Sequence, residues 1–244
     1  MKFGRNSTTE KSGYWSPGLA EEVLKKVFVF TKSVWTKLND FVINIDTMPD
    51  IPLRDLVKTG RPYLQGDFSE KSQYHDNNWY ESPDYWCIRK VAKIIKPQPE
   101  AHVVFYDLGS GKGRILCVMA QQPFKKVVGV ELFEHLCEAA RKNAQYMRRR
   151  KAPIEIVCDD VTRADISDGT VYFMFNPFGA DTMREVIANI KRSLSSNPRD
   201  IIIIYYNPVH EDILKSCTWL HEYSAFYTLT RRRVSFWSNL DINS

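Results

Sequence analysis

Hydrophobic and polar positions follow two different rhythms along the second half of the chain. Apolar runs of five or six residues are separated by longer segments in which apolar residues recur every three or four positions. The first rhythm is typical of buried strands, and the second is typical of amphipathic helices. Strands that alternate with helices favour a parallel sheet covered by helices on both faces. The sequence therefore predicts a doubly wound α/β domain.

The predicted elements can be placed by these apolar runs and by their flanking turn residues. A helix is expected to begin at Ser82-Pro83 and to run to about residue 96, where prolines end it. Strands are then predicted at residues 102–107, 126–131, 154–158, 171–175 and 200–206. Helices are predicted at residues 113–122, 133–149, 181–195 and 209–216. Two final apolar runs, 222–229 and 232–238, predict an antiparallel pair.

The first third of the chain has a different pattern. After a polar tail, apolar residues at roughly helical spacing predict one or two amphipathic helices over residues 17–44. Residues 45–82 lack periodicity and are rich in aromatic side chains. We therefore divide the chain into residues 1–82, a tail with a helical extension and a lid-like aromatic segment, and residues 83–244, the main domain. The extension either packs on this domain or forms a lid, a dimer element or a membrane-surface element.

Composition narrows the range of partners only slightly. The chain has 244 residues with 43% hydrophobic content, which suits one α/β domain with an extension. The net charge of +5 is spread along the sequence, so it permits an acidic partner without requiring one. Basic runs at residues 148–151 and 231–233 are interpreted as a solvated helix end and a hairpin turn, or alternatively as contacts to nucleic acid or another acidic partner.

The five cysteines carry no recognisable ligand motif. None forms a C-x-x-C pair, so the sequence predicts no zinc or redox site and no bound metal. Their irregular spacing argues against a disulfide framework and favours a reducing compartment. The first eleven residues lack the apolar core of a signal peptide, and no run approaches the ~20 apolar residues that a membrane span needs. The sequence therefore predicts a cytoplasmic protein without a membrane span.

A glycine-rich loop carries the main chemical signal. Asp107–Gly113 (Asp-Leu-Gly-Ser-Gly-Lys-Gly) follows an apolar strand and opens a helix. Glycines permit a sharp turn and let a ligand approach main-chain N–H groups at a helix N-terminus. The dinucleotide motif G-x-G-x-x-G would require glycine where Arg114 stands, and the phosphate-binding motif G-x-x-x-x-G-K-[ST] is absent. The spacing is G-x-G-x-G, preceded by an acid.

Three further motifs follow the ends of predicted strands. Glu131 ends the strand at 126–131, where an acid can accept hydrogen bonds from both hydroxyls of a ribose. Asp159 and Asp160 follow the next strand, and either can accept a hydrogen bond from an adenine amino group, with Asp160 favoured. Asn176-Pro177-Phe178 follows the strand at 171–175. Ligands of doubly wound sheets bind beyond the carboxyl ends of the strands, so the four motifs predict one site.

Together these motifs resemble the class I, seven-strand, Rossmann-like family of S-adenosylmethionine-dependent methyltransferases, over about residues 83–238. The resemblance implies the strand order 3-2-1-4-5-7-6 with the last strand antiparallel, and S-adenosyl-L-methionine as the cofactor. More narrowly, the motifs are similar to bacterial members without an assigned substrate. The cofactor contacts that the resemblance implies are Asp107, Gly109, Ser110, Gly111, Gly113, Glu131, Asp160 and Asn176.

The fourth motif departs from one branch of this family. Amino-group methyltransferases usually carry Asn or an acid, then two prolines and an aromatic residue, whereas this chain has only Pro177 between Asn176 and Phe178. We expect Asn176 and Phe178 to be the catalytic residues that shape the acceptor side; alternatively, Asn176 caps the next helix. Methyl transfer from a sulfonium is an in-line displacement that depends mainly on alignment.

The acceptor and the oligomeric state are not indicated by these motifs. The acceptor can be a small molecule, a protein or a nucleic acid. Two competing functions are a non-catalytic S-adenosylmethionine-binding module for regulation or interaction and an NAD-dependent oxidoreductase. Arg114 and the acid at Asp107 argue against the oxidoreductase.

Overall fold

The computed structural model of the chain describes residues 83–95, 97, 102–147 and 150–240. The predicted helical extension and the lid-like aromatic segment lie outside these residues, so the division at residue 82 stays a prediction. The strands are β1 (Val104–Leu108), β2 (Lys126–Glu131), β3 (Ile154–Cys158), β4 (Val171–Phe175), β5 (Ile202–Tyr206), β6 (His221–Tyr227) and β7 (Arg233–Ser238). The helices are α2 (Tyr85–Ile95), α3 (Arg114–Met119), α4 (Glu134–Tyr146), α5 (Ala180–Ser196) and α6 (Glu211–Lys215).

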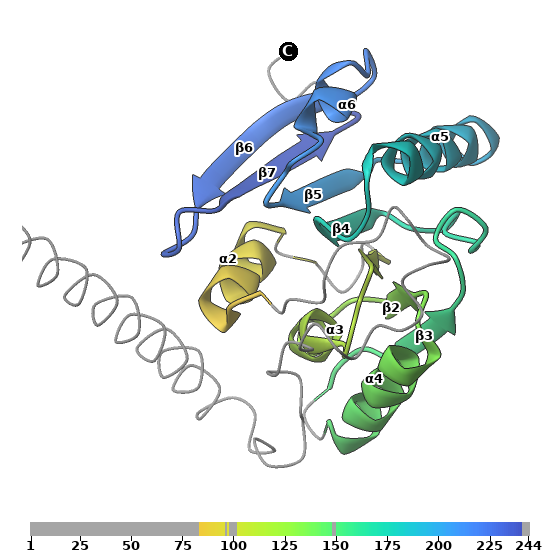
Figure 1. Cartoon of the computed structure of the whole chain (residues 1–244), viewed down its shortest axis with the longest axis vertical. Helices are drawn as coiled ribbons and strands as arrows, with labels where there is room; N and C mark the ends of the chain where they lie inside the picture. The colour runs from red at the N-terminus through yellow and green to blue at the C-terminus, as the bar shows by residue number, and fades with distance from the viewer. Residues whose placement is uncertain (1–82, 96, 98–101, 148–149, 241–244) are drawn as a thin grey trace, which may run out of the picture. The chain divides into compact units, whose positions relative to one another are not determined.

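The strands form one seven-stranded sheet in the order β3-β2-β1-β4-β5-β7-β6 (Figure 1). Strands β1 to β5 pair in parallel, and β7 runs antiparallel to both β5 and β6. The chain winds outward from β1 through β2 to β3, and then returns to build β4 and β5 on the other side. This arrangement confirms the predicted doubly wound, Rossmann-like fold with its single antiparallel strand.

Both faces of the sheet are buried, because alternate strand residues enter different cores. Tyr106 and Tyr172 stack on each other in an apolar core that also contains residues of α5 and α6. Their neighbours Phe105 and Phe173 stack in the same way and are also fully buried. Phe105 and Phe173 lie on the other face of the sheet from Tyr106 and Tyr172, because neighbouring strand residues point to opposite faces. Among the helices, α2 contacts α3, and α3 contacts α4. A sheet covered on both sides leaves the carboxyl ends of its strands as the natural place for a ligand.

Helix α2 begins slightly later than predicted. Asp84 accepts a hydrogen bond from the Cys87 N–H at 2.7 Å, so this acid caps the first turn and Tyr85 is the first helical residue. None of the helices in the described ranges combines the length and the apolar character that crossing a membrane requires.

Candidate functional site

The glycine-rich loop connects β1 to α3 through three left-handed backbone positions. Gly109, Gly111 and Gly113 have φ angles of 84°, 53° and 76°, which only glycine adopts without strain. Gly109 is also crowded, because a Cβ atom built on it would lie 2.3 Å from the Cβ atom of Pro177. The glycine-rich loop (the first motif) therefore packs directly on Asn176-Pro177-Phe178 (the fourth motif).

Most of the backbone N–H groups in this loop are already bonded within the protein. Gly109 and Ser110 both donate to the carbonyl of Val130, at 2.8 and 3.0 Å. Gly113 donates to the carbonyl of Ser110 at 2.9 Å, and Gly111 donates to a carboxylate. These four N–H groups thus have acceptors within the protein, and ligand contact at this loop stays a prediction. A pyrophosphate cradle needs such donors, so the loop is not arranged to hold a dinucleotide.

That carboxylate belongs to Glu131, the last residue of β2. Its two oxygens accept hydrogen bonds from the N–H groups of Gly111, at 2.8 Å, and Phe133, at 3.0 Å. The residue is only 7% exposed. Burial raises the pKa of Glu131, and these backbone hydrogen bonds oppose the rise. These hydrogen bonds fix the carboxylate in place, and its remaining lone pair capacity can still accept from a ligand hydroxyl.

A second buried acid lies close to Glu131. Asp107 is 4% exposed and pairs in register with Gly129 of the neighbouring strand. Burial and then repulsion by Glu131 raise the pKa of Asp107 well above its ordinary value. Two carboxylates at the base of one loop favour a ligand with positive charge and hydrogen-bond donors, and they disfavour an anion.

The Ser110 side chain packs against β2. Its Oγ atom is buried and is the one buried side-chain oxygen or nitrogen, among the residues that the structure describes, without a hydrogen-bond partner. A Cβ atom at Gly129 would lie 2.6 Å from this hydroxyl. The Ser110 side chain therefore fills the space over β2, and glycine at position 129 makes room for it.

Asp159 and Asp160 follow β3, and the Oδ1 atom of each accepts hydrogen bonds from within the protein. The Asp160 Oδ1 atom accepts from the N–H of Thr162 at 2.9 Å and from its hydroxyl at 2.8 Å. The Asp159 Oδ1 atom accepts from the Asp160 N–H and pairs with Arg163 at 3.0 Å. The Asp159 N–H donates to the carbonyl of Glu131, which brings this turn next to the acid at the end of β2.

The residues of the fourth motif have different surroundings. Asn176 follows β4 with a φ of 42°, is half-buried, and accepts a hydrogen bond from the Tyr205 hydroxyl at 3.4 Å. The N-cap of α5 is Gly179, so the alternative interpretation of Asn176 as a helix cap is wrong. Phe178 is 4% exposed and belongs to the apolar core beneath α5.

Three residues that were not among the predicted site residues hold the site in shape. Arg114 donates to the carbonyl of Pro83 at 2.9 Å, which ties the start of α3 to the residues before α2. Asn143 of α4 donates to the carbonyl of Lys112 at 2.8 Å and fixes the glycine-rich loop from the opposite side. Tyr205 orients Asn176. The only sequence signal among these was an arginine where a dinucleotide motif has glycine.

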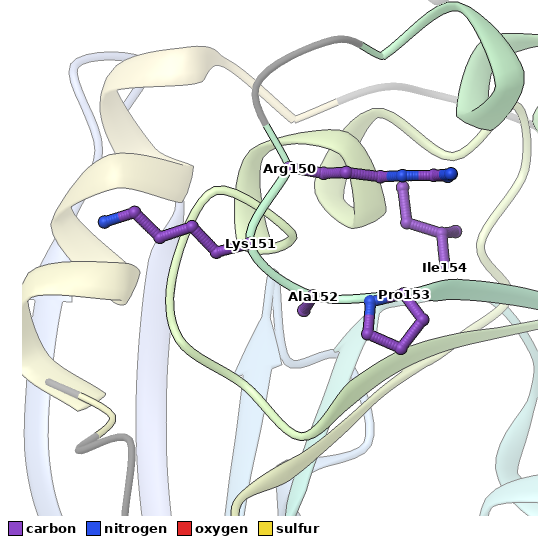
Figure 2. A pocket seen from close by; sticks show the side chains of 5 residues that line it. All are labelled: Arg150, Lys151, Ala152, Pro153 and Ile154. Atoms are coloured by element: carbon purple, nitrogen blue, oxygen red, sulfur yellow. The ribbon is translucent and has the colours of Figure 1, made fainter.

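A shallow pocket of about 350 Å³ lies elsewhere, at the start of β3. Its lining is Arg150, Lys151, Ala152, Pro153 and Ile154. The start of a parallel strand is at the opposite edge of the sheet from the motifs described above. Figure 2 shows that the two basic side chains point in opposite directions, so their charges do not converge on one ligand.

Comparison with known proteins gives a matching domain family and similar folds. Residues 105–197 match the family model of a methyltransferase domain. The fold is similar to that of an RNA methyltransferase from Salinibacter ruber in complex with S-adenosyl-L-homocysteine, with 20% identity, a TM-score of 0.50, and coverage of 68% of this chain and 97% of that chain. It is also similar to precorrin-6y C5,15-methyltransferase from Geobacter metallireducens GS-15, with 12% identity, a TM-score of 0.50, and coverage of 64% and 89%.

No curated protein sequence matches this chain significantly. The matched domain and the seven-stranded fold nevertheless agree on one class. Residues 105–197 match a methyltransferase domain, and the sheet has the strand order of the Rossmann-like fold that the motifs predicted.

Proposed function

We propose that the chain binds S-adenosyl-L-methionine at the carboxyl edge of the sheet and transfers its methyl group to an acceptor that approaches Asn176. The observation that carries this proposal is the pair of buried carboxylates, Asp107 and Glu131, at the base of the glycine-rich loop. S-Adenosylmethionine brings a sulfonium, an ammonium group and two ribose hydroxyls. Both positive charges and all of these donors are complementary to two buried acids.

The same pair of acids disfavours the oxidoreductase alternative. A nicotinamide dinucleotide would place a negatively charged pyrophosphate close to Asp107 and Glu131, where Coulombic repulsion opposes it. It would also meet a loop in which the N–H groups of Gly109, Ser110 and Gly111 already have acceptors. In our proposal Asp107 attracts the cationic methionine end of the cofactor, and Glu131 accepts from the ribose hydroxyls.

The adenine end of the cofactor is assigned to the turn after β3. We propose that Asp160 accepts from the adenine amino group through Oδ2, since its Oδ1 atom is committed to Thr162. The glycines at 109, 111 and 113 provide the loop shape, and Ser110 supports it from beneath.

On the acceptor side, Asn176 is the proposed catalytic group and Phe178 a positioning residue. The Tyr205 hydroxyl fixes the Asn176 side chain beyond β4, next to the central strand. Phe178 lies in the core and anchors the segment that presents Asn176. Alignment of nucleophile, methyl carbon and sulfur is the main requirement of the displacement, so a rigid support for this segment is chemically useful.

The acceptor itself does not follow from the fold. The two similar structures act, by their names, on RNA and on a precorrin. One fold therefore serves unlike acceptors, and small molecules, proteins and nucleic acids all remain within the proposal.

We also propose a cytoplasmic location. All five cysteines, which lie in the described part of the chain, are free thiols, and this supports a reducing compartment. Fractionation of cells that express the full chain would test it, and recovery in an oxidising compartment would count against it.

The cofactor proposal is tested by calorimetry of the full chain with S-adenosylmethionine, S-adenosylhomocysteine and NAD. We expect both sulfur compounds to bind and NAD to bind far more weakly. Glu131→Gln should lower the affinity for S-adenosylhomocysteine at least about tenfold, because charge-assisted hydrogen bonds are worth about 1.5–3 kcal/mol each. Glu138→Gln, an exposed acid on α4, is the matched control. NAD binding with no heat from either sulfur compound would refute the proposal.

A further inference from the structure

A cluster of three potential metal ligands lies beside the cofactor residues. One ligand atom each of Glu134, Cys137 and Cys158 lies within 4.8 Å of the other two. Two of these residues are on the first turns of α4, and the third ends β3. The sheet register explains why they meet, because Cys158 pairs with Glu131 and α4 begins three residues after Glu131. Helix α4 lies alongside β3 (Figure 1).

We propose that this cluster binds a thiophilic divalent cation, with Zn²⁺ as the leading candidate. Two thiolates and a carboxylate form a ligand set that zinc accepts, whereas Mg²⁺ and Ca²⁺ prefer oxygen ligands alone. Zn–S bonds of about 2.3 Å in a tetrahedral site place two sulfur atoms roughly 3.8 Å apart. The ligand atoms now lie within 4.8 Å of one another, and side-chain rotations of Glu134 and the two cysteines can bring them to the shorter separation of a tetrahedral site. Three protein ligands leave one position for water.

The surroundings of the cluster suit the entry of an ion. Cys137 is buried, Cys158 is half-buried, and Glu134 is exposed, so the site opens towards solvent through the carboxylate. Glu134 currently pairs with Arg141 at 2.6 Å, and the side chains of Arg141 and Glu134 are 42% and 63% exposed. Exposed ion pairs of this kind are weak, so the cation can displace Arg141. Each thiol releases its proton to solvent, so one ion binds with the loss of two protons.

The position of the site suggests what the ion would do. Cys137 donates through its Sγ atom to the backbone carbonyl of Glu131 at 3.3 Å, and the Phe133 N–H donates to the carboxylate of the same residue. A bound ion would join the first turns of α4 to the end of β3 and would hold this segment still. Holding this segment still would also hold Glu131, the proposed ribose acceptor. Only this consequence rests on the proposed function, because metal binding itself can be measured without the cofactor.

The test uses the reduced, metal-free full chain, titrated with Zn²⁺ by calorimetry and with Co²⁺ by absorption spectroscopy. We expect one ion per chain and a thiolate-to-cobalt charge-transfer band with the spectrum of a tetrahedral site. Cys158→Ser should weaken Zn²⁺ binding at least about a hundredfold, since even partners outside the ligand shell contribute about 10–100-fold. Glu134→Gln should weaken it about tenfold. Cys217→Ser, at another half-buried thiol, is the matched control and should bind Zn²⁺ normally.

Three outcomes would overturn the proposal. The first is unchanged Zn²⁺ affinity in a folded Cys158→Ser protein, and the second is an equal loss of affinity in Cys217→Ser. The third is a disulfide between Cys137 and Cys158 in protein isolated under reducing conditions, with no zinc bound. Cys158 is the half-buried member of the pair, so its serine variant is the one expected to fold, and circular dichroism verifies this. Calorimetry with S-adenosylhomocysteine on the same variant tests the cofactor proposal separately.

Discussion

Pro177 lies so close to Gly109 that a Cβ atom at position 109 would come within 2.3 Å of the proline Cβ atom. These residues belong to the first and fourth motifs, which are 68 residues apart in sequence. Strands β1 and β4 are neighbours in the sheet, and the turns that follow them therefore press against each other. The glycine-rich loop and the segment after β4 share this contact, so a change in one is expected to move the other.

The first prediction concerns this contact. Gly109→Ala should lower the free energy of unfolding by about 1–3 kcal/mol or more, because it combines a left-handed backbone angle with the clash. Urea unfolding monitored by circular dichroism measures the change. In a Pro177→Gly background the same substitution should cost clearly less, because the opposing Cβ atom is gone. Equal costs in both backgrounds would show that the contact with Pro177 is not the cause.

The second prediction concerns pH. Burial raises the pKa of Asp107 and Glu131 above their ordinary values of 3.8 and 4.5. The folded protein then binds protons more tightly than the unfolded chain, so its stability without cofactor falls as the pH rises from about 4 through the raised pKa values. This is the opposite of the usual behaviour of salt-bridged acids.

Asp107→Asn removes one of these buried charges. Melting temperatures measured from pH 4 to pH 8 should fall less steeply in this variant, and at pH 7 it should melt above the parent protein. Its affinity for S-adenosylmethionine should drop at least about tenfold. Stability would thus rise as function is lost, as expected for a site that holds uncompensated charge. Asp200→Asn, at an exposed acid, should change neither property. A variant that is less stable than the parent at pH 7 would contradict this account.

The third prediction separates Asp159 from Asp160. Asp160→Asn should weaken the binding of S-adenosylhomocysteine about tenfold, because its free oxygen is replaced by a donor that faces the adenine amino group. Asp159→Asn should change the affinity little, since its acceptor oxygen serves the turn and the exposed Arg163. The inosine analogue of S-adenosylhomocysteine provides a second readout, because its 6-oxo group can accept from the new amide. The Asp160→Asn protein should therefore lose most of the preference for adenine. A larger loss of affinity for S-adenosylhomocysteine in Asp159→Asn than in Asp160→Asn would assign adenine to Asp159.

Several elements could be predicted from the sequence almost to the residue. Strands β2, β3 and β4 have the predicted bounds, because each is a mainly apolar run bounded by polar residues or by proline. Helix α3 is shorter than the predicted 113–122, because Gly113 takes a left-handed angle and the helix ends at Met119. Strand β1 begins at Val104 rather than at residue 102, since His102 has a φ of 48° and lies in a turn.

Features that depend on packing between elements could not be predicted in this way. The sequence contains no short cysteine motif, and the register between β2 and β3 is what brings Cys158 to α4. The direction of the Ser110 side chain depends on the missing Cβ atom at Gly129 in the neighbouring strand. The burial of Phe178 depends on how α5 lies over the sheet. Periodicity along a single chain segment contains no information about such contacts.

The last prediction separates the roles of Asn176 and Phe178. Asn176→Gly removes the side chain and keeps the φ of 42° accessible, so the backbone should not change. Transfer of a radiolabelled methyl group from saturating S-adenosylmethionine into cell extract should fall about 10–100-fold, with cofactor affinity within about twofold of the parent, because the side chain acts in the transition state. Phe178→Ala should instead lose about 3–5 kcal/mol of stability, as expected for a buried aromatic residue.

Phe178→Leu is the control that keeps the core filled, and it should fold and retain most of the transfer activity. If Asn176→Gly bound the cofactor far more weakly but transferred methyl groups normally at saturation, Asn176 would belong to the adenosine side. If Phe178→Leu lost as much activity as Asn176→Gly while remaining stable, the aromatic ring itself would contact the acceptor, and its assignment as a positioning residue would be wrong. The two variants together therefore decide which side chain of the fourth motif acts directly in methyl transfer.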